Sequence, residues 1–205
     1  MPFDHSLVYI VDDDSAIRGG IKRLVESIGL SARSFSNAND FFADYDASVV
    51  GCLVLDIRMP EISGMKLQAL LIERNIMVPI IFITGHADVP TAVDALKKGA
   101  FDFQEKPFNE RHLLDRIQEA LAKDLRDREV RAMRDEVTKR YQTLSDREKQ
   151  VLKLVLVGKP NKMIARDMDL GQSTIELHRA NVMRKMEAGS LPELVSMVNV
   201  IDPMH

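Results

Sequence analysis

The sequence places acidic, basic and hydroxyl-bearing residues just after a series of short apolar runs. These residues are Asp12, Asp13, Asp14, Asp56, Thr84 and Lys106. Three or four carboxylates in one pocket would repel one another unless a cation neutralised them, and Mg²⁺ suits oxygen ligands at such density. Together with a lysine and a hydroxyl, the set predicts a phosphoryl-transfer site in which Asp56 is the nucleophile that forms an acyl phosphate. Asp14 by itself is better explained as a helix cap or a solvated loop residue.

The apolar runs ahead of these residues predict the strands that would bring them together. Runs 7–11, 52–55 and 80–83 do not alternate with polar residues and are rich in β-branched side chains. Such runs are typical of strands buried on both faces of a parallel sheet. Residues 101–103 predict a short last strand. Because ligands of these sheets bind beyond the carboxyl ends of the strands, we expect the polar residues to meet there.

Amphipathic stretches between the runs predict helices. The first helix is expected to have its cap at Ser15 and to stop at Gly29, and the next two are expected to start after Asn37 and near Met65. A fourth has Pro90 in its first turn and stops at Gly99, and a fifth is capped by Asn109. The alternation of strand and helix predicts an α/β fold with a doubly wound, five-stranded parallel sheet of the flavodoxin-like kind.

Beyond about residue 120 the sequence predicts helices only. Residues 121–143 lack Gly and Pro and carry dense charge of both signs, which predicts a solvated linker helix. Its apolar residues recur at spacings of three and four, so this helix could also pair with its counterpart in a second copy. Those residues are Val130, Met133, Val137 and Tyr141. We therefore predict three parts, at residues 1–122, 123–143 and 144–205.

The last part, an all-α domain, has the layout of a helix-turn-helix, whose second helix enters the major groove of DNA. The predicted elements are a capping box formed by Ser145 and Glu148, a short helix capped by Asn161, a turn at Gly171, and a longer helix that opens at Gln172 or Ser173 and ends near Met186. The predicted internal contacts are Ile164, Ala165, Ile175 and Val182. Other three-helix bundles show similar spacings, so the pattern alone is not decisive.

Composition narrows the possible classes of protein without selecting one. Residues 1–122 carry 12 Lys and Arg against 18 Asp and Glu, whereas residues 141–205 carry 9 against 8. A DNA-binding function must therefore rest on motifs and not on charge. The single cysteine, Cys52, excludes an intramolecular disulfide and a cysteine metal cluster. We find neither a membrane-spanning segment nor a secretory signal, and expect a cytoplasmic protein with no membrane partner.

Residues 4–122 resemble the receiver domain of response regulators. The matching segments are Val-Asp-Asp-Asp at 11–14, Asp-Ile-Arg-Met-Pro at 56–60, Thr-Gly-His at 84–86 and Glu-Lys-Pro-Phe at 105–108. The resemblance implies that Asp56 accepts a phosphoryl group from a sensor histidine kinase. It also implies that Mg²⁺ is held by Asp13, Asp56 and the backbone carbonyl of Arg58, with Asp12 acting through water.

The same resemblance implies a switch that follows phosphorylation. The hydroxyl of Thr84 is expected to move towards the phosphate, next to Lys106, and the aromatic ring of Phe103 is expected to turn inward. Phe103 could alternatively be an ordinary core residue of its strand. The peptide bond between Lys106 and Pro107 is a candidate for the cis form, as in other receivers.

Residues 144–199 resemble the NarL/FixJ, or LuxR-type, DNA-binding domain, and the whole chain best fits the FixJ branch. The matching segments are 144–148, 158–165, 173–179 and 184–186. The implied DNA-binding residues are Asn161, Lys162, Ser173, Thr174, Glu176, Leu177, Arg179, Asn181 and Lys185. Many relatives have Lys in place of Glu176, and Glu can accept from a cytosine amino group, so this departure could alter specificity. Arg179 and Lys185 could also be solvated surface charges.

These expectations describe a two-component transcription regulator. Phosphorylation would promote a homodimer that binds double-stranded promoter DNA, with RNA polymerase as a further partner. We expect no enzymatic activity beyond self-catalysed phosphoryl acceptance and slow autodephosphorylation. A signalling adaptor whose helical tail binds protein remains an alternative.

A phosphatase of the haloacid-dehalogenase kind is a second alternative. Such enzymes need an acid two residues after the nucleophile, where this chain has Arg58, and they would leave the C-terminal helices unexplained. Arg58 and His86, each two residues past a predicted site residue, occupy positions that in receivers influence hydrolysis of the acyl phosphate.

Overall fold

The computed structural model describes residues 5–85 and 89–201. The chain divides into two compact units, Met1–Asp127 and Arg128–His205. His86, which the sequence suggested as an influence on hydrolysis, lies outside the described residues.

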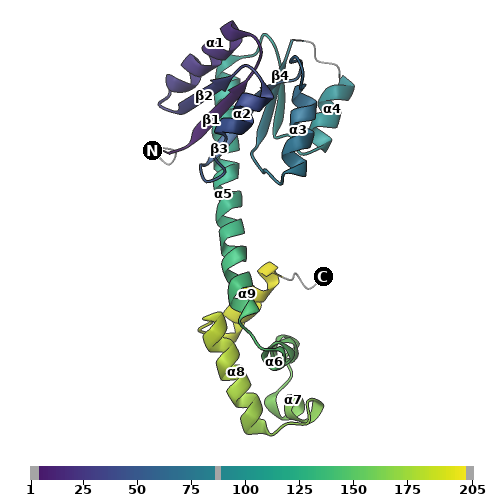
Figure 1. Cartoon of the computed structure of the whole chain (residues 1–205). Coiled ribbons are helices and arrows are strands. Elements are labelled where there is room, and N and C mark those ends of the chain that lie inside the picture. The colour runs from purple at the N-terminus through teal and green to yellow at the C-terminus, as the bar shows by residue number, and fades with distance from the viewer. Residues whose placement is uncertain (1–4, 86–88, 202–205) are drawn as a thin grey trace. The chain divides into compact units, whose positions relative to one another are not determined.

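The N-terminal unit is built on a five-stranded, fully parallel sheet (Figure 1). Its strands are β1 (Leu7–Val11), β2 (Ser31–Phe35), β3 (Gly51–Asp56), β4 (Ile80–Thr84) and β5 (Asp102–Glu105), in the order β2-β1-β3-β4-β5. The apolar runs form β1, β3 and β4, every residue of which is buried. The predicted doubly wound sheet is confirmed, although β5 begins one residue later and ends two residues later than expected.

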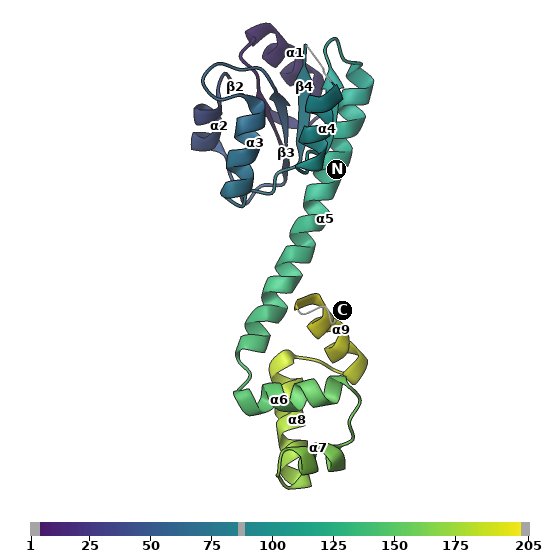
Figure 2. The same ribbon diagram turned by 90° about the vertical axis from the view of Figure 1, so that its right-hand side faces the viewer.

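Helices cover both faces of this sheet because alternate strand residues point to opposite sides. On one face α1 (Ser15–Glu26) and the first turns of α5 (Glu110–Gln142) pack against β1, β3 and β4 through residues such as Ile21 and Ile117. On the other face lie α2 (Ala38–Asp44), α3 (Gly64–Glu73) and α4 (Val89–Lys97), which contribute Phe41, Leu67 and Ala95 (Figure 2).

Side-chain caps fix where several of these helices begin. Asn37 accepts a hydrogen bond from the backbone of Asp40 at 2.9 Å, and Asn109 accepts one from the backbone of His112 at 3.0 Å, as expected of caps. The prediction for α1 was wrong by one position. Asp14 is its N-cap, and Ser15 is the first residue of the helix.

Helix α5 is a single helix of 33 residues where the sequence predicted a receiver helix and a separate linker helix. Residues 109–143 contain no Gly or Pro that would interrupt it. The description of its second part as a solvated linker was incomplete, because Asp124 is buried and accepts a hydrogen bond from the backbone of Gly51 at 2.9 Å. None of the described helices combines the length and the apolar composition that crossing a membrane requires.

The C-terminal unit consists of helices: the end of α5 followed by α6 (Asp146–Leu156), α7 (Asn161–Asp167), α8 (Gln172–Met186) and α9 (Leu191–Ile201). The capping box of Ser145 and Glu148 is present at the start of α6. Ile164, Ala165 and Ile175 share one small core, and Val182 belongs to a second core with Leu152 and Leu194, so the predicted internal contacts are buried as expected.

One sequence prediction fails in this unit. Asn161 is not a cap, because Pro160 holds that position and Asn161 is the first residue of α7. Of the residues through which the helix could pair with a second copy, Val137 is buried in the core beside Leu152 and Tyr141 is partly buried against it. The apolar residues of α5 do recur at helical spacing, but the C-terminal half of that stripe packs within this unit. Val130 and Met133 are exposed by 63% and 61%.

Candidate functional site

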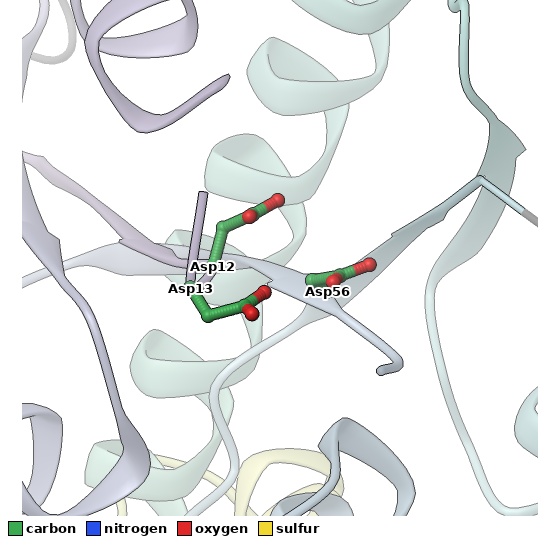
Figure 3. Close-up of side chains that lie close together, drawn as sticks. All are labelled: Asp12, Asp13 and Asp56. Carbon is green, nitrogen blue, oxygen red and sulfur yellow. The ribbon is translucent and has the colours of Figure 1, made fainter. Parts of the chain in front are cut away.

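Three carboxylates gather at the carboxyl ends of β1 and β3. Val11 of β1 pairs with Leu55 of β3, so the residues that follow, Asp12 and Asp56, lie side by side at the edge of the sheet. One oxygen of each of Asp12, Asp13 and Asp56 lies within 4.8 Å of the others (Figure 3). Asp12 and Asp56 are buried, whereas Asp13 is exposed. We call these three residues the acidic pocket.

Lys106 joins the acidic pocket from the loop after β5. Its Nζ lies 2.7 Å from Asp12 Oδ2 and 3.3 Å from Asp56 Oδ1. Its backbone N–H donates to the carbonyl oxygen of Thr84 at 2.7 Å, which fixes the loop against the end of β4. The peptide bond between Lys106 and Pro107 is cis, as the resemblance implied.

The charges of the acidic pocket are not balanced, because its three carboxylates are joined by one lysine among the residues that the structure describes. Burial raises the pKa of Asp56 above its ordinary value, Lys106 opposes the rise, and the neighbouring carboxylates Asp12 and Asp13 add to it. Burial alone would lower the pKa of Lys106, yet its contacts with Asp12 and Asp56 raise it above its ordinary value. The pocket therefore has the electrostatics of a cation site.

The donors fit Mg²⁺, which binds oxygen ligands and keeps several waters. Both carboxylate oxygens of Asp12 accept hydrogen bonds from the protein, one from Lys106 and one from the backbone of Asp14 at 2.8 Å. Asp12 is thus suited to a contact through water. Asp13 and Asp56 offer side-chain oxygens for direct contact.

Thr84 and Phe103 lie on the two strands beyond β3. Asp56 pairs with Ile83 of β4, so the buried Thr84 stands one position further along the same edge. Phe103 pairs with Phe82 and is half-buried against the core under α2, α3 and α4. Strand pairing thus brings Thr84 to the edge that carries the acidic pocket and places Phe103 within the neighbouring strand.

The loop after Asp56 depends on a glycine that sequence reasoning missed. A Cβ atom at Gly64 would lie 2.2 Å from the carbonyl oxygen of Asp56, a distance that no side chain tolerates. Gly64 also donates its N–H to the carbonyl of Ile57 at 2.9 Å. The exposed Arg58 is the second residue of this loop. A glycine directly before the apolar start of α3 was the available signal.

The predicted DNA-binding residues lie on α7 and α8. Lys162, Ser173, Glu176 and Leu177 are exposed, and Leu177 is exposed by 61%. Asn161, Thr174, Arg179, Asn181 and Lys185 are partly buried. Three side-chain hydrogen bonds organise this surface: Arg179 donates to Asn161 at 2.7 Å, Arg184 donates to Asn181 at 3.3 Å, and Gln172 donates to Glu176 at 3.2 Å.

Lys185 is engaged within the C-terminal unit. Its Nζ lies 2.7 Å from the buried Glu148 carboxylate and donates to the carbonyl of Thr143 at 3.1 Å. Burial alone would raise the pKa of Glu148, but Lys185 and the hydrogen bonds of Ser145 lower it below its ordinary value. The charge of Lys185 therefore ties α8 to the start of α6.

Comparison with known proteins adds family matches to both units. Residues 8–118 match the response regulator receiver domain, and residues 142–198 match the bacterial regulatory proteins of the luxR family. The response regulator protein TodT of Pseudomonas putida is 47% identical over 190 residues, which cover 93% of this chain and 84% of TodT. The transcriptional regulatory protein FixJ of Rhizobium meliloti is 43% identical over 190 residues, 93% of each chain.

Solved structures give the same result. The response regulator StyR has a TM-score of 0.85 and 39% identity, and the match covers 95% of this chain and 98% of that one. Full-length FixJ from B. japonicum has a TM-score of 0.58 and 37% identity, with 98% of each chain covered.

Proposed function

This chain belongs to the response regulators that join a receiver domain to a luxR-family DNA-binding domain, and we propose that the signal it receives is a phosphoryl group on Asp56. Membership makes it a two-component transcription regulator with a histidine kinase and DNA as partners. The observation that supports Asp56 is its position: it is buried at the end of β3, between two further carboxylates and the ammonium of Lys106.

The proposed transfer needs little from the protein besides position and charge. An oxygen of Asp56 attacks the phosphorus of a phosphohistidine on the kinase. The new P–O bond forms as the P–N bond breaks, and the released imidazole nitrogen takes up a proton. Lys106, already within 3.3 Å of Asp56, balances negative charge on the transferred group, and Thr84 at the next strand end supplies a hydroxyl donor.

Asp13, Asp56 and the backbone carbonyl of Arg58 are proposed to hold Mg²⁺, with Asp12 acting through water. When bound, the ion supplies positive charge that offsets the repulsion between the carboxylates and the incoming phosphoryl group. Gly64 lets the chain pass closely behind the carbonyl of Asp56, within the loop that carries Arg58. The side chain of Arg58 is exposed, and only the backbone carbonyl of this residue is proposed as a ligand.

Phosphorylation is proposed to favour a homodimer through the face formed by α4 and β5. Val89, Val93 and Leu96 lie on one stripe of α4 and are exposed by 76%, 42% and 46%. Movement of Thr84 and Phe103 towards the phosphorylated site would change the neighbouring surface. A dimer presents two reading helices to adjacent half-sites, which raises affinity for DNA well above that of one unit.

The DNA contacts are proposed to come from Asn161, Lys162, Ser173, Thr174, Glu176, Leu177, Arg179, Asn181 and Lys185. The exposed Leu177 on a polar helix suits contact with thymine methyl groups. RNA polymerase is the further proposed partner and the cytoplasm the proposed location. No catalytic activity is proposed beyond the chain's own phosphoryl acceptance and its slow hydrolysis.

Phosphoryl acceptance is tested by Asp56→Asn with acetyl phosphate as the donor. Intact-protein mass spectrometry should show one added phosphoryl group on the wild type and none on the variant. Asp115→Asn, which changes an exposed carboxylate on α5, is the matched control and should accept phosphate normally. Continued stoichiometric labelling of the Asp56 variant would reject the site.

A DNA-binding experiment distinguishes a transcription regulator from a signalling adaptor whose helices bind protein. Selection of DNA fragments by the phosphorylated protein, followed by gel shifts with and without acetyl phosphate, should give a sequence that binds more tightly after phosphorylation. A failure to bind DNA in either state would favour an adaptor whose helices bind protein.

A further inference from the structure

Asp13 differs from its two neighbours in the acidic pocket because its side chain has no partner among the described residues. The carboxylate of Asp12 accepts from Lys106 and from the backbone of Asp14, and Asp56 lies against Lys106. Asp13 is exposed, and within the part of the chain that the structure describes its carboxylate makes no hydrogen bond or ion pair. The direction of this side chain must therefore come from its backbone.

The backbone around Asp13 is held by an arginine that the sequence analysis did not single out. Arg18, in the first turn of α1, places Nη1 2.7 Å from the carbonyl oxygen of Asp12 and 2.9 Å from that of Asp13. These two carbonyls belong to the peptide groups on either side of the Asp13 Cα atom. Because φ and ψ of Asp13 are set by those two peptides, one guanidinium nitrogen that contacts both carbonyls restrains the direction of its Cα–Cβ bond.

The hydrogen bonds of the rest of the loop show what Arg18 adds. Asp14 uses its carboxylate to cap α1, accepting from the backbone of Ala16 at 2.7 Å and of Ile17 at 3.3 Å. The backbone N–H of Asp14 is taken by Asp12, at the opposite end of the turn. That N–H belongs to the same peptide group as the Asp13 carbonyl, so Asp12 and Arg18 hold this peptide together, while Arg18 also holds the carbonyl of the peptide before Asp13.

We propose that Arg18 is a positioning residue that directs Asp13 towards a divalent cation in the acidic pocket. The inference rests on the proposed function, in which Asp13 and Asp56 hold Mg²⁺. Arg18 would act through the backbone and would not touch the ion. Residues that orient metal ligands in this way commonly change metal affinity by 10- to 100-fold when they are replaced.

The direction in which Mg²⁺ affinity changes when Arg18 is replaced tests this inference. The guanidinium is a positive charge close to a cation site, so its removal on charge grounds alone would tighten Mg²⁺ binding. Loss of the two hydrogen bonds to the carbonyls would instead release Asp13 and weaken binding. The two explanations predict opposite changes in the dissociation constant.

The experiment is calorimetric titration of Mg²⁺ into the full-length wild type, Arg18→Met, Arg18→Gln and Arg23→Met. Both Arg18 variants should bind Mg²⁺ about tenfold more weakly than the wild type. Arg23→Met removes the same charge from an exposed position on the same helix and should bind within about twofold of the wild type. Equal or tighter binding by the Arg18 variants would overturn the inference.

Hydrogen exchange supplies a readout that needs no metal. In the metal-free protein, exchange at the amides of residues 13–15 should be faster in Arg18→Met than in the wild type, whereas exchange in β3 should be unchanged. If Arg18→Met does not fold, Arg18→Gln is judged by the same two measurements. A wild type that binds no Mg²⁺ would contradict the proposed function, while unchanged binding by a folded Arg18 variant would contradict the role of Arg18 alone.

Discussion

A lysine contacts a buried carboxylate at 2.7 Å in each unit of the molecule, Lys106 with Asp12 and Lys185 with Glu148. In the C-terminal unit the pair is balanced, the backbone N–H of Ser145 also donates to the Glu148 carboxylate, and the backbone N–H of Glu148 donates to the Ser145 hydroxyl. In the N-terminal unit the same kind of pair stands among surplus carboxylates. The pKa of Glu148 is lowered and the pKa of Asp56 is raised, both relative to their ordinary values.

The difference shows how one kind of contact can serve structure or function. A balanced pair with every hydrogen bond made stabilises the fold, and removal of one partner leaves the other buried and unpaired. A pocket with surplus charge of one sign reduces stability until a ligand of the opposite sign arrives. Removing a carboxylate should therefore lower the free energy of unfolding at the balanced pair and raise it at the acidic pocket.

The largest change is expected for Glu148→Ala. The variant loses the capping box at α6 and leaves the ammonium of Lys185 without its carboxylate. The free energy of unfolding of the C-terminal unit should fall by about 3 kcal/mol. Urea denaturation of the full-length protein, followed by hydrogen exchange in α6 and α8, measures the loss. Glu129→Ala, at an exposed position of α5, is the control. A cost below about 1 kcal/mol would rank the pair with ordinary surface ion pairs.

The sequence could predict Glu148 as a cap but not as the partner of Lys185. The capping box is a local pattern of residues three apart, whereas the ion pair joins positions 37 residues apart in the chain. Periodicity has the same limit in α5, since it marks Val137 as apolar without showing that it shares a core with α6, α8 and α9 of the same unit. The apolar face was predictable, but its partner depends on tertiary packing.

An opposite and smaller change is expected for Asp13→Asn in the presence of EDTA. Removing one of three clustered carboxylates relieves repulsion, so the N-terminal unit should gain about 1 kcal/mol of unfolding free energy. The same variant should lose most of the stabilisation that Mg²⁺ gives the wild type. Thermal unfolding with EDTA and with Mg²⁺ gives both values. A variant that is less stable than the wild type in EDTA would show that Asp13 makes a favourable contact.

The acidic pocket was more predictable than the C-terminal pair because parallel strands end at one edge of the sheet. Asp12, Asp56 and Thr84 each follow an apolar strand, and strand order then places them together. Gly64 and Arg18 were missed for different reasons. Gly64 is required by a close approach of the backbone, and Arg18 acts on carbonyl groups, which no residue pattern displays.

The smallest expected effect is a difference in pH dependence between Asp56→Asn and Glu148→Gln, both in EDTA. The folded pKa of Asp56 is raised, so the folded state binds more protons than the unfolded state between the ordinary value of 3.8 and the folded value. Wild-type stability therefore falls as pH rises through that window. The advantage of Asp56→Asn should grow from pH 3.8 upward and become constant above the folded pKa.

Glu148 has the opposite sign because its folded pKa is lowered from 4.5. Its contribution to stability is fully present above pH 4.5 and is lost as pH falls through the folded pKa. The deficit of Glu148→Gln should therefore be constant at higher pH and shrink below 4.5. Urea denaturation at half-unit steps from pH 3.5 to 7 measures both slopes. Parallel slopes for the two variants would mean that the folded pKa of Asp56 is not raised above its ordinary value, and the contrast between the two regions would fail.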